Sequence, residues 1–172
     1  MDWQSEIFMA TMVKQQVADA DRTGLWRHPL PEPGATESEL DGVEQALGYA
    51  LEPEFRRFLG HSNGWSSFYR DIHLFAARQL LGGPGQERVR ALLKTPHVDN
   101  ELSGYDSADL LPIAVSENGH DVFLLASANA LLPGVVFWIT GQAVDSFDNF
   151  STWFLAMVDY NRCEQARLQS LG

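Results

Sequence analysis

The sequence predicts an α+β fold in which a mainly antiparallel sheet packs against helices. Helical apolar spacing fills much of residues 2–61, short apolar runs gather in the middle and second half, and a long amphipathic segment closes the chain. The chain has 172 residues, which fits a single domain with one core. Helices come first and strands cluster later, which favours α+β over a parallel doubly wound sheet.

The N-terminal region is predicted to be a helix followed by an extended arm. Residues 2–20 show helical apolar spacing with Asp2 at the N-cap position, and residues 27–36 (RHPLPEPGAT) contain three prolines and a glycine. We therefore distinguish a helix and Pro-rich arm, residues 1–34, from a main domain, residues 35–172, within one globular unit.

Two short helices follow the arm. Thr36 and Glu39 have the spacing of a capping box, and Gly48 can end this helix because glycine adopts positive φ without steric cost. The next helix begins at Pro53, which suits the first turn, and stops before Asn63-Gly64, a pair that can reverse the chain.

The rest of the chain alternates apolar runs with turns. The predicted strands are 71–75, 110–116, 121–127 and 134–140, with 117–120 (ENGH) as a hairpin turn. The predicted helical segments are a turn at 76–81, a helix at 86–95 and a closing helix at 146–168, capped by Asp145 or Ser146. Residues 82–85 and 96–109 are predicted loops.

Composition limits the classes of function. The net charge is −11 and the pI is about 4.7, which disfavours nucleic-acid binding and suits a basic partner, although many proteins are acidic for solubility alone. Cys163 is the single cysteine, so an intrachain disulfide and a paired-cysteine zinc site are excluded. With neither a signal peptide nor a membrane-spanning apolar run, the sequence predicts a cytoplasmic location.

An ordered series of motifs carries a family resemblance. The first group is Glu44, Leu47-Gly48, Leu51, Pro53, Glu54-Phe55, Phe58-Leu59 and Asn63-Gly64, with Glu52 inserted before the proline. The later group is LLPIAVSENGHDVFLL (110–125), GVVFWI (134–139) and AVDSFDNFSTWFLAMV (143–158). Their order over roughly residues 35–160 resembles the SUKH superfamily of Smi/Knr-type proteins, so the main domain is expected to be SUKH-like.

The resemblance implies a non-enzymatic function. Many bacterial members look like immunity proteins that bind and block a cognate toxin domain, often a nuclease, whereas fungal relatives regulate cell-wall assembly. No cofactor, metal or catalytic residue marks the family, so the motif residues are interpreted as structural. We find no independent catalytic signature in the residues: the five histidines form no HExxH pair, and Cys163 lies in no cysteine-enzyme motif.

Candidate partner-binding residues lie in two segments. In the acidic loop Asp99, Glu101, Asp106 and Asp109 surround Tyr105, so that carboxylates could meet Lys or Arg while the ring serves as an anchor. A merely solvated acidic loop is the equally favoured alternative, and a calcium loop is disfavoured because Leu110 replaces the final bidentate Glu.

The second segment contains Trp65 and Tyr69, which could line an aromatic binding face. For Trp65, core packing after the Asn-Gly turn is an open alternative.

The leading hypothesis is therefore an immunity protein that neutralises a cognate bacterial polymorphic toxin by stoichiometric binding. The predicted partner is a toxin domain with a basic surface, with no nucleic acid and no membrane involved. The alternative is an intracellular scaffold or regulatory interaction domain, and an enzyme with a spatially assembled site comes third. The sequence leaves the oligomeric state open.

Overall fold

An antiparallel meander organises the computed structural model, which describes residues 1–93, 102, 104–140 and 143–170. The strands are β1 (Trp65–Tyr69), β2 (Ile72–Leu74), β3 (Leu110–Ser116), β4 (Val122–Ala126), β5 (Val136–Ile139) and β6 (Ala143–Phe147), hydrogen-bonded in that order. The helices are α1 (Trp3–Ala20), α2 (Glu37–Leu47), α3 (Pro53–His61), α4 (Pro84–Leu93) and α6 (Phe150–Ser170), with 3₁₀ turns η1 (Ala77–Leu81) and η2 (Ser107–Asp109). The predicted α+β class is confirmed.

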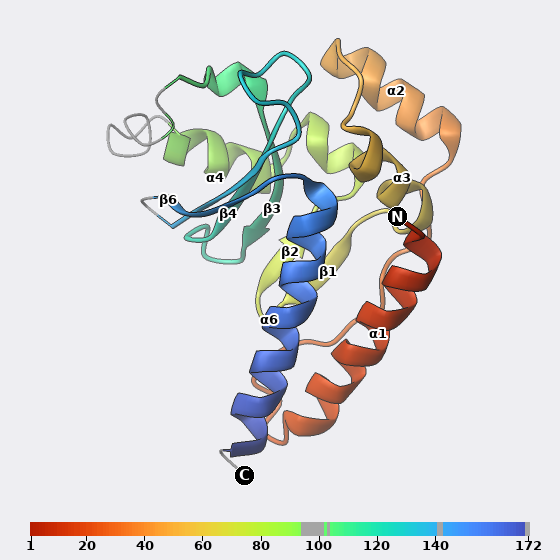
Figure 1. Cartoon of the computed structure of the whole chain (residues 1–172), viewed down its shortest axis with the longest axis vertical. Helices are drawn as coiled ribbons and strands as arrows, with labels where there is room; N and C mark the ends of the chain where they lie inside the picture. The colour runs from red at the N-terminus through yellow and green to blue at the C-terminus, as the bar shows by residue number, and fades with distance from the viewer. Residues whose placement is uncertain (94–101, 103, 141–142, 171–172) are drawn as a thin grey trace.

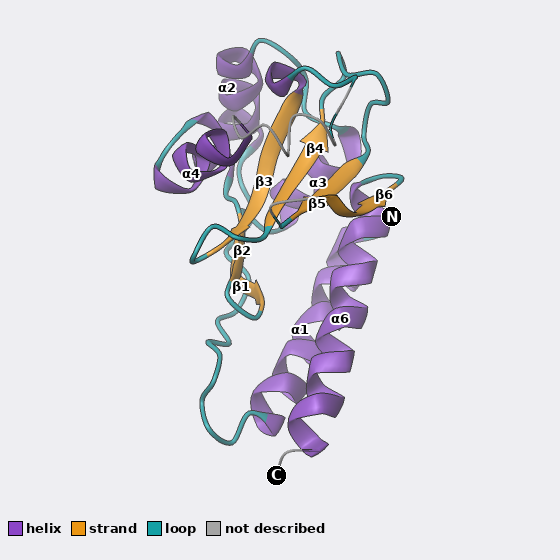
Figure 2. Ribbon diagram, turned by 90° about the vertical axis from the view of Figure 1, so that its left-hand side faces the viewer, coloured by secondary structure: helices purple, strands orange, loops and turns teal. Residues whose placement is uncertain are grey.

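Helices cover both faces of the sheet. Figures 1 and 2 show α1 and α6 side by side, running in the same direction and extending past the sheet, while α2 and α4 lie on its other side. Every residue of the central strand β3 is buried, as is every residue of β4. A strand covered on both faces buries consecutive residues instead of alternate ones, which explains these apolar runs.

The first helix belongs to the core of the domain. The Trp3 ring of α1 is 1% exposed and lies 5.4 Å from Phe58, 5.5 Å from Phe150 and 5.2 Å from Phe154. Its indole N–H donates to the Glu54 carboxylate at 3.0 Å. Trp3 therefore links α1 to both α3 and α6, although the Pro-rich arm separates α1 from them in sequence.

The short helices have the ends that the sequence predicts. The Thr36 hydroxyl accepts from the Glu39 N–H, the Glu39 carboxylate accepts from the Thr36 N–H, and Gly48 has φ 80°. Gly64 has φ +89°, and a Cβ there would lie 2.7 Å from the Ala76 backbone nitrogen, so this turn requires glycine twice over.

The predicted cap of α1 differs in one detail. Asp2 occupies the N-cap position, but its carboxylate accepts from the Ser5 hydroxyl at 2.6 Å and caps no backbone amide.

Two strands were missed, and two helix starts were wrong. β1 and β6 form the edges of the sheet, where each has one neighbour and the sequence signal for a strand is weak. Residues 145–147 pair with β5 as strand β6, so the predicted caps Asp145 and Ser146 are wrong. The Asn149 side chain caps α6 instead, accepting from the Thr152 N–H at 2.9 Å. α4 begins at Pro84, inside the predicted loop.

Candidate partner-binding surface

Trp65 and Tyr69 are part of the scaffold. Trp65 is 1% exposed, and its indole N–H donates to the Pro29 carbonyl at 3.0 Å, which fastens the Pro-rich arm to β1. Tyr69 is 8% exposed, its ring lies 5.8 Å from that of Tyr160, and the Arg70 guanidinium sits 5.1 Å from its centroid. Neither ring offers a free face to a partner.

Tyr105, Asp106 and Asp109 lie together around η2, at the start of β3. The Asp106 carboxylate caps the turn by accepting from the Ala108 N–H at 2.9 Å. The Asp109 carbonyl accepts from the Ser127 N–H at 2.8 Å, and the half-buried Tyr105 ring meets Phe137 edge-on at 4.9 Å. Asp99 and Glu101, the other two predicted carboxylates, lie outside the described residues.

The two predicted segments are far apart. Tyr69 pairs with Ile72, which pairs with Ser116 at the far end of β3, while η2 adjoins Leu110 at its start. Leu110 and Ser116 are six residue steps apart along the strand, a span of about 20 Å. The aromatic pair and the acidic turn therefore do not form one face.

Two exposed leucines beside η2 were not predicted. Leu131 and Leu132, in the loop between β4 and β5, are 68% and 58% exposed. A Cβ on Gly104 would lie 3.6 Å from Leu131 Cδ2, so this loop lies against the acidic segment. The sequence signal that could have located them is the Pro133-Gly134 pair, which turns the chain directly after the leucines.

We call Tyr105, Asp106, Asp109, Leu131 and Leu132 the η2 surface. Within the part of the chain that the structure describes, neither aspartate forms an ion pair; Asp106 is exposed and Asp109 is half-buried. Adjacent exposed apolar side chains favour association, and carboxylates around them add electrostatic selectivity.

The segment between α2 and α3 borders this surface. Burial, followed by the Asp109 charge, raises the pKa of the Tyr49 hydroxyl. Burial also raises the pKa of Glu52, whose carboxylate accepts from the Phe55 N–H at 2.7 Å and caps α3. A Cβ on Gly134 would lie 3.7 Å from Glu52 Cγ, so the leucine loop also contacts this segment.

Two histidines, a residue type common in catalytic sites, make structural contacts here. His73 Nδ1 accepts from the Ser67 N–H at 3.1 Å, His28 Nε2 lies 3.2 Å from the Asp21 carboxylate, and Cys163 is exposed. Across the described residues, no three His, Cys, Asp or Glu side chains are arranged to hold a metal ion, and no helix is long and apolar enough to cross a membrane.

The motif residues of the first half hold α2 and α3 together. One Glu44 carboxylate oxygen accepts from the Leu51 N–H at 2.8 Å, and the other accepts from Arg56 Nε at 3.2 Å. Phe55, Phe58 and Leu59 are each 0% exposed. These contacts explain the spacing of the motif by packing and hydrogen bonding alone.

Comparison with known proteins identifies the family. No curated protein matches the chain. Residues 34–156 match the SMI1/KNR4 family (SUKH-1), which covers well over half of the sequence. The chain therefore belongs to the SMI1/KNR4 family (SUKH-1).

Proposed function

We propose that this protein is an immunity protein, which neutralises a cognate bacterial toxin by forming a stoichiometric complex through the η2 surface. The observation that carries the proposal is the pair of exposed leucines beside two aspartates that form no ion pair with the residues that the structure describes. Family membership supports a protein-binding role of this type.

The leucines and the aspartates of the η2 surface would have different roles in binding. Leu131 and Leu132 present apolar area that becomes buried in a complex, which slows dissociation. Asp106 and Asp109 attract a basic partner over a longer range and thereby speed association, an effect that added salt screens.

A nuclease toxin fits this chemistry well. Its substrate groove must attract a phosphate backbone and is therefore basic. An acidic protein with net charge −11 is repelled by nucleic acid but attracted to such a groove. Occupation of the groove in the cytoplasm, where the nuclease would act, blocks the toxin without any catalytic step.

Co-expression with the toxin domain from the neighbouring gene tests this function. We expect cell survival and co-purification of the two chains in equal amounts. If the toxin kills the cells and no complex forms, the immunity proposal is wrong. Recovery of several unrelated partners in place of one toxin would support the alternative, an intracellular scaffold or regulator.

Surface variants test which residues carry the binding. Truncating interface hot spots costs 2 kcal/mol or more each, so the Leu131→Ser/Leu132→Ser protein should bind at least about thirtyfold more weakly. Leu30→Ser is the matched control, because Leu30 is 70% exposed but lies on the Pro-rich arm. Equal affinities for the double variant and the control would remove the η2 surface from the proposal.

Charge variants separate steering from anchoring. Asp106→Asn/Asp109→Asn should lower the association rate and its salt dependence while changing the dissociation rate little. Asp19→Asn/Glu87→Gln removes two exposed carboxylates from α1 and α4 and should leave both rates unchanged.

A further inference from the structure

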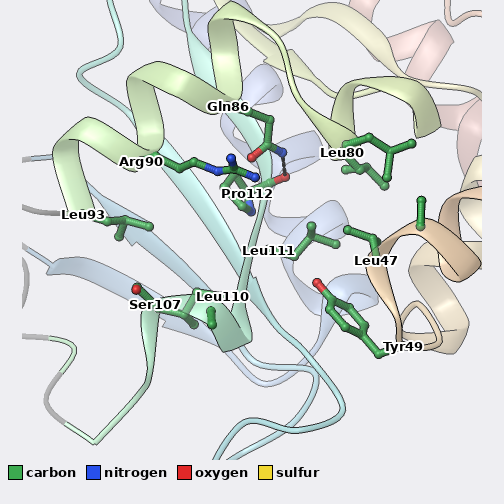
Figure 3. Close-up of a pocket in the computed structure, with 13 residues that line it drawn as sticks. Leu47, Tyr49, Leu80, Gln86, Arg90, Leu93, Ser107, Leu110, Leu111 and Pro112 are labelled. Atoms are coloured by element: carbon green, nitrogen blue, oxygen red, sulfur yellow. Dashed lines mark hydrogen bonds between the residues drawn. The ribbon is translucent and has the colours of Figure 1, made fainter.

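A pocket lies between α2, η1, α4 and the start of β3 (Figure 3), with a volume of about 480 Å³. Apolar walls come from all of these elements, with Leu47 on α2, Leu80 on η1, Leu93 on α4, and Leu110 and Leu111 on β3. The volume falls within the range of about 300–1,000 Å³ that is typical of small-molecule sites.

Four polar side chains also line the pocket: Tyr49, Gln86, Arg90 and Ser107. Gln86 is 2% exposed, and its amide donates to the Pro112 carbonyl at 3.0 Å, which ties α4 to β3 and fixes this wall. Figure 3 shows Arg90 extending from α4 toward β3, while Tyr49 enters from the α2 side.

Arg90 is the one cationic residue among those that line the pocket. Among the described residues, its guanidinium forms no hydrogen bond or ion pair, whereas Arg88 on the same helix donates to the carbonyls of Pro84 and Glu117. A free guanidinium offers five N–H donors in a planar fork that matches a carboxylate. The protein has 23 acidic and 12 basic residues, yet the exposed side chain of Arg90 lines this pocket without an ion pair to any carboxylate of the described residues.

We propose that this pocket binds a small molecule with an apolar body and a single carboxylate. The body lies against the leucine walls, the carboxylate pairs with Arg90, and the hydroxyls of Tyr49 and Ser107 are available to its remaining lone pairs. The Asp109 charge acts on Tyr49 at the edge of the pocket, and it repels a doubly charged phosphate more strongly than a singly charged carboxylate. This activity goes beyond toxin binding, although the pocket adjoins the η2 surface through Ser107 and Ala108.

Titration calorimetry with three matched probes tests the proposal: octanoate, 1-octanol and octylamine, which share a chain and differ in charge. The wild-type protein should bind octanoate about tenfold or more tightly than octanol, because a hydrogen bond between charged groups strengthens binding by about that factor. Octylamine should bind most weakly. Absence of octanoate binding, or equal binding of octanoate and octylamine, would overturn the proposal.

Variants locate the binding within the molecule. Arg90→Met keeps the unbranched chain but removes the charge, so the preference for octanoate over octanol should disappear while octanol still binds. Arg88→Met, on the same helix outside the pocket lining, should retain the preference. Ala108→Trp should close the pocket and abolish the binding of both probes, because Ala108 is an exposed residue of its lining. An unchanged preference in Arg90→Met would refute the assignment of the carboxylate to Arg90.

Discussion

Replacement of Glu164 by glutamine should destabilise the protein mainly through loss of charge. Glu164 lies on α6, is 2% exposed, and receives hydrogen bonds from Trp26 at 2.9 Å, from Arg70 at 2.7 and 3.2 Å and from Arg167 at 2.6 and 3.0 Å. One carboxylate therefore joins α6 to the chain after α1 and to the end of β1.

The expected magnitude follows from the pKa of this carboxyl group. The Arg167 hydrogen bonds, with those of Arg70 and Trp26, outweigh burial and lower the pKa of Glu164 from 4.5 to about 2. A folded-state pKa this far below the unfolded value stabilises the ionised form by about 3 kcal/mol. The stabilisation is present above pH 4.5 and is lost as the pH falls toward 2.

Glu164→Gln should thus cost about 3 kcal/mol at pH 7 and about 2 kcal/mol at pH 3.5. Arg70 and Arg167 are 39% and 42% exposed, so water can solvate them after the change, and the loss should not reach the upper values for fully buried pairs.

Urea unfolding at both pH values measures this difference. Asp159→Asn is the control, because Asp159 pairs with Arg162 on the exposed face of the same helix and should lose less than about 1 kcal/mol. A Glu164→Gln protein as stable as the wild type at pH 7 would refute the reasoning. An equal loss at pH 7 and pH 3.5 would also refute it, since packing and not charge would then be responsible.

Two further predictions concern the scaffold. Gly34→Ala should lower the urea midpoint strongly, because its Cβ would lie 2.0 Å from the Gly60 carbonyl oxygen. Gly42→Ala should raise stability by up to about 1 kcal/mol, because that Cβ meets nothing within 4 Å and alanine favours the helix. A Gly34→Ala protein more stable than the Gly42→Ala protein would contradict the close approach of Gly34 to Gly60. Burial lowers the pKa of Lys14 to about 8, although its ammonium donates to the Ser67 carbonyl at 2.7 Å. The cost of burying the charged ammonium is complete below pH 8 and is relieved as the pH rises toward 10.5. The stability of the wild-type protein should therefore rise between pH 7.5 and 9.5 relative to that of Lys14→Met. Parallel plots of stability against pH for the two proteins would exclude this account.

Local chemistry predicted those elements whose signals lie within a few residues. The Thr36–Glu39 capping box and the β3–β4 hairpin depend on short-range geometry and were confirmed. The start of α6 was different, because Asp145, Ser146 and Asn149 all have capping side chains. Only pairing with β5 decides that residues 145–147 form a strand, and that pairing is a tertiary contact.

The candidate sites show the same division. The carboxylates of the η2 surface were predicted, because a loop rich in aspartate must face solvent. Leu131 and Leu132 were missed, because apolar residues in a sequence indicate the core unless the fold shows otherwise. Trp65 could not be placed, since its partner Pro29 is 36 residues away in the chain. The pocket around Arg90 is assembled from segments between residues 46 and 112 and has no local signature.

Exposed leucines beside carboxylates give the strongest physical reason to search for a partner at the η2 surface. Arg56 binds three carboxylates, those of Glu37, Asp41 and Glu44, and Glu164 is shared by two arginines, while other exposed carboxylates such as those of Asp19 and Glu87 form no ion pair among the described residues. Asp106 and Asp109 form no such pairs within the described residues, and they lie beside leucines that are more than half exposed. Solubility alone would require the charges but not the leucines, since exposed apolar area promotes association. The combination is explained if a basic, partly apolar partner covers both.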